Sequence, residues 1–204
     1  MHAGIEELMQ AMSPEHGADE RVDWAVARAS WGVTFPEDYR AFMAVYGSGS
    51  ISDEVDVLAP SPVGTTLVAS MEGVTRDARA AWAFEGGEAV LDVDPSHILA
   101  WGVTSGPDWL CWLTTDDDPD RWPVLVIGRH ARPMFAEHPF GMAEFLCRLL
   151  SEDSARWERW PLGIGRPLLM NPAPSFVHWQ VQKDRWNAGL DPATGAPSKY
   201  PEGF

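Results

Sequence analysis

Apolar residues recur at a spacing of three to four positions in five stretches of the chain, a spacing typical of one buried face of an amphipathic helix. The pattern therefore predicts five helices, with the end of the last one left open as far as Trp157. The stretches are residues 5–12, 22–29, 36–46, 67–82 and 142–149. In the second stretch the predicted apolar stripe is Val22, Ala25, Val26 and Ala29, and Trp24 lies off it.

The third stretch carries the clearest local signal. Thr34 and Glu37 have the spacing of a capping box, in which each side chain satisfies a free amide at the start of a helix. Tyr39, Phe42, Met43 and Tyr46 then form a bulky stripe. Gly47 follows it, and glycine takes the left-handed conformation that ends helices. We expect this helix to begin near Pro36 and to stop before Gly47.

Short runs rich in β-branched and aromatic residues, bounded by turn formers, predict strands. In the run DWLCWLT (residues 108–114) both alternating faces are apolar, which indicates a central strand covered on both sides. Helices, then consecutive strands, then a helix predict an α+β fold with a largely antiparallel sheet of about four to six strands and a closing helix. The predicted strands are residues 54–60, 97–104, 108–114, 122–128 and 132–137.

The character of the chain changes after Trp160. Residues 1–160 have the composition of one folded domain, whereas residues 161–204 are dense in Pro and Gly and still carry large apolar side chains such as Phe176 and Trp179. A floppy tail rarely keeps so many of these. We therefore expect a Pro/Gly/Trp-rich extension that packs on the domain or on a second copy in a homodimer.

Charge narrows the range of partners. The chain holds 30 acidic residues against 15 Lys and Arg, for a formal net charge of -15. Such a surface repels phosphate backbones, so it disfavours direct nucleic-acid binding and suits a basic protein partner. The N-terminal residues lack the pattern of a signal peptide, and no apolar run is long enough to span a membrane. A cytoplasmic protein is expected, with Cys111 and Cys147 as buried free thiols.

The loop TTDDDPDR (residues 114–121), here called the acidic turn, gathers the carboxylates of Asp116, Asp117, Asp118 and Asp120 beside Trp122. Calcium loops alternate their oxygen ligands and add a glycine and a distal Glu, neither of which is present, so a solvated turn is favoured over a metal site. An aromatic anchor among acids suits a basic protein partner. We predict that these five residues form a partner-binding surface.

No arrangement typical of catalysis stands out. The histidines lack the i, i+4 spacing of helical metal sites, and His130 and His138 are expected in surface or turn positions. Gly47-Ser48-Gly49-Ser50 does not match a nucleophile elbow. Burial in an apolar strand would raise the pKa of Cys111 and make the thiol inert. We therefore expect no enzyme activity, no cofactor and no metal.

Four stretches together resemble the SUKH superfamily, the proteins similar to fungal cell-wall-assembly regulators, many of which are bacterial immunity proteins. They are LAWGVTSGPDWLCWLT, DPDRWPVLV, FPEDYRAFMAVYGSG and FGMAEFLCRLL. Phe35-Pro36 opens and Tyr46-Gly47 closes the early helix of that pattern, Gly106-Pro107-Asp108 replaces its Gly-Asp turn, and Phe145-Leu146 is its closing pair. The resemblance covers about residues 20–150 and not the extension.

The resemblance implies a non-enzymatic module that binds and neutralises a cognate toxin, commonly a nuclease or deaminase, in bacterial competition. The sequence leaves two alternatives open. One is a regulatory or scaffolding module without a toxin partner. The other is a small-molecule-binding protein or enzyme with a pocket lined by Trp101, Trp109, Trp112 and Trp122, although large rings more often fill a core.

Overall fold

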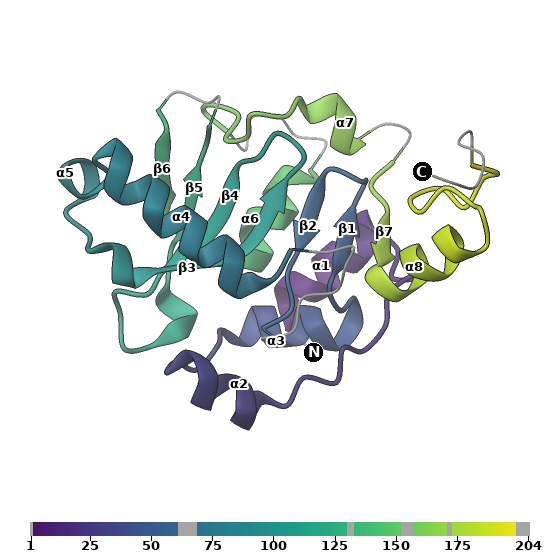
Figure 1. The fold of residues 1–204 in the computed structure, drawn as a ribbon, viewed down its shortest axis with the longest axis horizontal. Helices are drawn as coiled ribbons and strands as arrows, with labels where there is room; N and C mark the ends of the chain where they lie inside the picture. Colours follow the sequence, from purple (N-terminus) through teal and green to yellow (C-terminus); the bar gives the residue numbers. More distant parts are fainter. Residues whose placement is uncertain (1, 61–68, 130–132, 152–156, 171–172, 199–204) are drawn as a thin grey trace.

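The computed structural model describes residues 2–60, 69–129, 133–151, 157–170 and 173–198. Within these residues it contains helices on both sides of a single sheet (Figure 1). The helices are α1 (Ala3–Ala11), α2 (Trp24–Trp31), α3 (Glu37–Val45), α4 (Met71–Glu85), α5 (Glu88–Leu91), α6 (Met142–Leu149), α7 (Arg166–Met170) and α8 (Trp179–Asn187), with 3-10 turns η1 (Pro95–His97) and η2 (Pro119–Arg121). The strands are β1 (Gly49–Ile51), β2 (Val55–Val57), β3 (Ile98–Thr104), β4 (Trp109–Leu113), β5 (Val124–Ile127), β6 (Phe135–His138) and β7 (Phe176–His178).

The strands form one antiparallel sheet in the order β6-β5-β4-β3-β2-β1-β7. The predicted α+β class is confirmed. The sheet has seven strands rather than four to six, because β1 and β7 are buried at every residue and so lack the alternation that marked β2. Strand β7 belongs to the region after Trp160 and pairs with β1, so the chain brings the extension back to the edge of the sheet.

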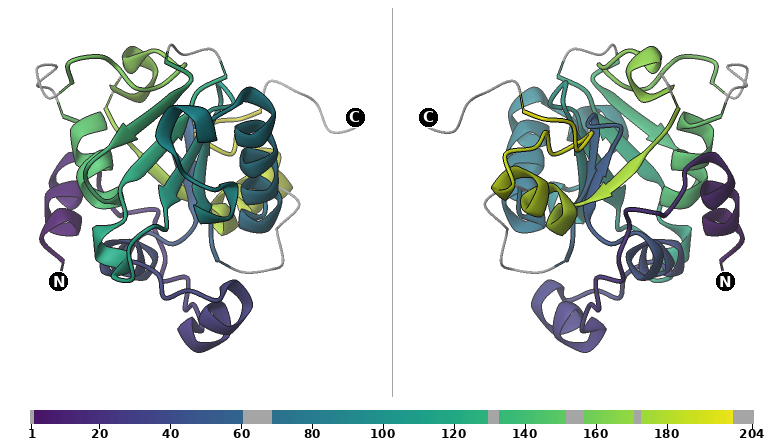
Figure 2. Two further views of the ribbon diagram at one scale, coloured as in Figure 1. Left: turned by 90° about the vertical axis from the view of Figure 1, so that its left-hand side faces the viewer. Right: turned by 90° about the vertical axis from the view of Figure 1, so that its right-hand side faces the viewer.

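Helix α4 covers one face of the sheet, and α1, α3 and α6 lie on the other (Figures 1 and 2). The central strand β4 lies between β3 and β5, and four of its five residues are buried. Its Trp112 packs edge-on against Tyr39 of α3, with ring centroids 5.0 Å apart. The prediction that this strand is covered on both sides is confirmed, as are the buried free thiols of Cys111 and Cys147.

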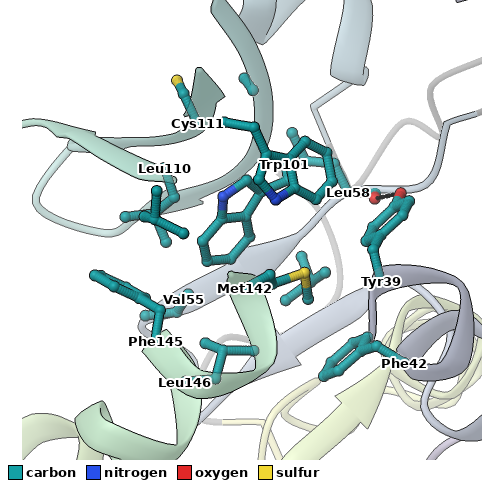
Figure 3. Close-up of a cluster of buried hydrophobic side chains, with 14 of the residues drawn as sticks. Tyr39, Phe42, Val55, Leu58, Trp101, Leu110, Cys111, Met142, Phe145 and Leu146 are labelled. Carbon is teal, nitrogen blue, oxygen red and sulfur yellow. Dashed lines mark hydrogen bonds between the residues drawn. The ribbon is translucent and has the colours of Figure 1, made fainter. Parts of the chain in front are cut away.

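The core between the sheet and α3 and α6 combines aromatic rings with aliphatic side chains (Figure 3). Tyr39 and Phe42 reach in from α3, and Phe145 and Leu146 from α6, toward Trp101 of β3; Trp101 and Phe145 pack edge-on with centroids 6.0 Å apart. The Tyr39 hydroxyl donates to the Leu58 carbonyl. Each such ring removes on the order of 200 Å² from water, so this layer is the main source of hydrophobic stabilisation on that face.

Helix α2 buries a different stripe from the one predicted. Val26 is 55% exposed, and the residue that α2 buries is Ala27. Trp24 and Trp31 pack against the core on the same side as Ala27, with Trp24 5.8 Å from the ring of Phe35. The two indoles offer more apolar area than the valine and alanine side chains, so they set which face turns inward.

The predicted end of the last helix needs correction, and the predicted start of the fourth lies outside the described residues. Helix α6 ends at Leu149 and does not continue to Trp157. Its last residues already complete the apolar face, and the Trp157 indole instead donates to the carbonyl of Arg148. Of the fourth predicted stretch, residues 71–82 lie in α4, whereas Leu67 is outside the described residues.

One half-buried carboxylate, that of Glu20, attaches the extension to the N-terminal region by accepting hydrogen bonds. Glu20 accepts from the amide and hydroxyl of Ser48, both at 2.8 Å. It also accepts from the indole of Trp179 at 3.3 Å and pairs with His178 Nε2 at 3.0 Å. Since His178 Nδ1 accepts from the Gln180 amide, Nε2 carries the proton that is donated to Glu20.

A second carboxylate, that of Asp108, holds the start of the extension. It is fully buried at the turn between β3 and β4. Its Oδ2 accepts from the Thr104 hydroxyl at 3.0 Å and from the Gly163 amide at 2.7 Å. Asp108 thus joins the predicted Gly-Pro-Asp turn to residues beyond Trp160.

We predict that the Glu20 cluster makes the stability of the protein depend on pH. Burial raises the pKa of Glu20, but hydrogen bonds from His178, Ser48 and Trp179 outweigh it and lower the pKa from 4.5 to about 2. The stabilisation is therefore complete above pH 4.5 and is lost as the pH falls toward 2. Glu20→Gln should lower the free energy of unfolding by on the order of 2–3 kcal/mol at neutral pH, measured by urea denaturation.

The difference between the wild type and Glu20→Gln should shrink steadily as the urea series is repeated below pH 4.5. Glu15→Gln is the matched control, because Glu15 is exposed in the same segment and should leave the whole pH series unchanged. A difference that stays constant from neutral pH to pH 2 would contradict the assignment.

Candidate functional site

The acidic turn is built largely by its own carboxylates, which accept from backbone amides two residues on. Asp116 accepts from the Asp118 amide at 3.0 Å, and Asp118 accepts from the Asp120 amide at 3.1 Å, which starts η2. Asp116 also pairs with Arg121 at 3.3 Å. The side chain of Asp117 is exposed and makes no bond to any residue of the described ranges.

Trp122 lies beneath the acidic turn rather than on its surface. It is 4% exposed, its Nε1 donates to the Asp116 carbonyl at 2.7 Å, and its ring lies 6.3 Å from that of Trp112. The indole therefore fixes the turn to the core. Whether it and the four aspartates contact a partner stays a prediction.

Asp120 has a structural role that the sequence pattern did not indicate. Its Oδ1 accepts from the amide of Glu37, the first residue of α3. Thr34 is exposed, and the N-cap residue of this helix, Pro36, makes no side-chain cap, so the predicted Thr34–Glu37 capping box is wrong. The carboxylate that satisfies the helix start comes instead from 83 residues further along the chain.

Asp38 likewise accepts from a backbone amide at the start of another helix, α6. It is buried, and its Oδ2 accepts from the Ala143 amide in the first turn of α6 at 2.8 Å. Gly141, the N-cap residue of α6, makes room for it, because a Cβ there would lie 2.9 Å from Asp38 Oδ2. Sequence reasoning missed this residue; its only signal is an acid inside a run of buried aromatic positions.

The surroundings of Asp38 raise the pKa of its carboxyl above the usual value. Burial raises the pKa of this carboxyl, and the amides of Ala143 and Tyr39, which lower it, offset only part of that effect. The nearby charge of Asp120 raises it further. A buried acid at the meeting point of two helix starts is the type of group that marks functional sites in many proteins.

Next to the acidic turn the surface is hollowed where α1, α3, η2 and α6 begin. This acidic hollow has a volume of about 620 Å³. Asp120 belongs both to the acidic turn and to the hollow, so the two form one continuous surface. The lining residues are His2, Gly4, Glu7, Pro36, Glu37, Asp38, Trp112, Pro119, Asp120, Trp122, Gly141, Ala143, Glu144, Cys147 and Arg148.

The predicted tryptophan pocket does not form as one group. Trp101 and Trp112 are fully buried in the core, and Trp109 is half-buried with the Arg129 guanidinium 5.8 Å from its ring centroid. Only Trp112 and Trp122 line the acidic hollow.

His138 is not in the surface or turn position that was predicted. It ends β6, and its ring packs against Phe145 at 5.4 Å and Trp157 at 5.1 Å. Burial, with a contribution from Arg148, lowers the pKa of His138 to about 4. The aromatic neighbours therefore keep this imidazole neutral at physiological pH. His130 lies outside the described residues.

Neither a reactive Cys111 thiol nor a metal-binding cluster is found among the described residues. Burial raises the pKa of the Cys111 thiol well above its usual range. Among the described residues, no three His, Cys, Asp or Glu side chains lie close enough together to hold a metal ion. None of the helices described combines the length and the apolar composition needed to cross a bilayer.

Comparison with known proteins identifies one family. Residues 21–146, more than half of the chain, match the SMI1 / KNR4 family (SUKH-1). No curated protein and no solved structure matches the chain. The matched region contains the acidic turn, α3 and the start of α6, whereas α1 and the extension lie outside it.

We predict that Asp120 stabilises the fold through its cap on α3. Asp120→Ala should lower the free energy of unfolding by about 1–2 kcal/mol, since it removes the acceptor of a helix-start amide. Urea denaturation at neutral pH measures the change. Asp117→Ala, in the same turn, is the control and should stay within about 0.5 kcal/mol of the wild type. Equal effects of the two substitutions would refute the capping role.

Proposed function

The chain belongs to the SMI1 / KNR4 (SUKH-1) family, and from this premise we propose that it is a non-enzymatic protein-binding module that neutralises a cognate toxin by direct contact. The observation that carries the proposal is the continuous acidic surface of the acidic turn and the acidic hollow, set on a fold whose family fits protein binding. The proposed partner is a basic protein, such as a nuclease or deaminase toxin.

Charge supports a basic partner. The chain carries a net charge of -15, and nucleases need positive surfaces to bind phosphate backbones. Opposite net charges accelerate encounter by long-range attraction, and salt weakens that attraction. A protein that covers the basic surface of such a toxin with carboxylates would compete directly with its nucleic-acid substrate.

The rigidity of the surface also supports the proposal. The acidic turn is fixed by the Trp122 indole from below, by the Arg121 pair and by the cap on α3. A surface that is already ordered loses little conformational entropy on binding, which favours tight association. Asp117 projects from this rigid base with its carboxylate exposed.

The decisive experiment uses the product of the gene adjacent to the one that encodes this chain. Purified protein should bind that product, and co-expression should restore growth to cells that the product inhibits. Capture of a partner that is not toxic would support the regulatory alternative, and no binding to the adjacent product with no protection would overturn the toxin-neutralising proposal.

We predict that charge reversal in the acidic turn slows association. Asp117→Lys should lower the association rate with the basic partner several-fold at about 0.05 M salt, because a rim charge acts mainly on encounter. Biolayer interferometry at low and high salt measures the rates. The difference from wild type should largely vanish at about 0.5 M salt, where the screening length is only about 4 Å.

Glu85→Lys is the matched control, since Glu85 is an exposed acid at the end of α4 on the opposite face of the sheet (Figure 2). It changes the net charge equally but lies away from the proposed surface. An equal slowing by both substitutions would show that only overall charge matters and that the acidic turn has no particular role.

A further inference from the structure

The acidic hollow has a defined shape and an aromatic inner wall in addition to its negative charge. Its walls come from α1, from the first turn of α3, from α6 and from η2, so four separate elements fix its shape. A volume of about 620 Å³ lies in the range of pockets that enclose a small ligand or a few side chains. Trp112 and Trp122 form its inner wall.

Acids outnumber bases in the lining. The basic residues of the lining are Arg148 and His2, and the acidic ones are Glu7, Glu37, Asp38, Asp120 and Glu144. Arg148 is already paired with Glu144 at 2.7 Å, and its guanidinium lies 4.4 Å from the ring centroid of Phe140. The charge balance of the hollow therefore favours a cation, even though three helix starts contribute partial positive charge.

The carboxylate oxygens of the lining differ in what they already bind. Both Asp38 oxygens accept from backbone amides, and Asp120 Oδ1 accepts from Glu37 N. In contrast, Asp120 Oδ2 and the whole Glu37 carboxylate make no bond to any residue in the part of the chain that the structure describes. These unbound oxygens lie on adjacent elements, η2 and the start of α3.

Acceptors on two elements favour a guanidinium over an ammonium. Arginine presents five N–H donors in a planar fork, so it can bind Asp120 and Glu37 at once, whereas lysine is a compact point charge. Arginine also stacks on aromatic rings more readily. Within this chain the Arg148 guanidinium already lies between a carboxylate, Glu144, and an aromatic ring, Phe140.

We propose that the acidic hollow receives an arginine side chain of the protein partner, bound by Asp120 Oδ2 and the Glu37 carboxylate, with Trp122 behind them. The proposal deepens the proposed function and rests on it for the existence of a partner. The arginine side chain enters from the face that carries the acidic turn, so the carboxylates of the turn attract the basic surface while the hollow fixes one residue of it.

The test is a titration of the full chain with Nα-acetyl-arginine amide, followed by amide and indole NMR signals. The Trp122 indole and the backbone amides of Glu37 and Ala143 should shift in a saturable way. Nα-acetyl-citrulline amide, which keeps the shape without the charge, should produce no saturable shift. Nα-acetyl-lysine amide should bind weaker by about threefold or more, because it cannot engage both carboxylates.

Glu37→Gln should weaken binding of the arginine derivative by about threefold or more, since it removes a charged acceptor. Glu85→Gln is the control and should leave the binding unchanged. The exposed position of Glu37 makes loss of the fold unexpected, and unchanged indole signals of the free variant check this. Binding that is absent, equal for citrulline or lysine, or insensitive to Glu37→Gln would overturn the arginine site.

The two proposals fail separately. If the product of the adjacent gene binds the wild type tightly but Nα-acetyl-arginine amide does not bind at the hollow, the arginine site is wrong and the protein-binding function stands. If Nα-acetyl-arginine amide binds there and no protein partner is found, the chemistry of the hollow stands and its proposed use is wrong.

Discussion

The burial of the central strand on both faces is the constraint on which the rest of the structure depends. Cys111 and Trp112 are adjacent on β4 and both are fully buried, so helices must cover both sides of the sheet. On one side α4 does so; on the other, α3 and α6 meet over Trp112 and Trp101. Because α3 and α6 must pack there, their first turns come together, and the free amides of Glu37 and Ala143 bind carboxylates from outside their own helices.

Those acceptors explain why acids gather at this place. Asp120 reaches α3 from the loop between β4 and β5, and Asp38 reaches α6 from α3. Each carboxylate thus connects two elements that are distant in sequence. A group of acids that looks like a ligand site in the sequence therefore also stabilises the fold. The distinction matters for function, because a carboxylate that caps a helix is already committed, and only the oxygens left over can bind a partner.

The sequence predicted elements well wherever a local period fixed them. The stripe of α3, the strands β2 to β6 and the two-sided β4 follow from alternation or helical spacing within one segment. Prediction from the sequence failed where the deciding contact was distant. Asp120, and not the expected Thr34–Glu37 capping box, accepts from the first amide of α3. The buried stripe of α2 is set by the packing of Trp24 and Trp31. Strand β7 was not predicted because its three residues are all buried and show no alternation. For the site, the sequence indicated the acids of the turn but not the hollow, which exists only once α1, α3 and α6 meet.

The same geometry resolves an apparent conflict between the hollow and its proposed cationic ligand. Helix starts carry partial positive charge, and three of them line the hollow. At α3 and α6 that charge is met by Asp120 and Asp38, and at α1 the Gly4 amide donates to the His2 side chain. What remains exposed to an incoming group is the second oxygen of Asp120 and the carboxylate of Glu37, both negative. The helix starts therefore hold these acids in place and orient them, and the field that a partner meets at the rim is that of the acids.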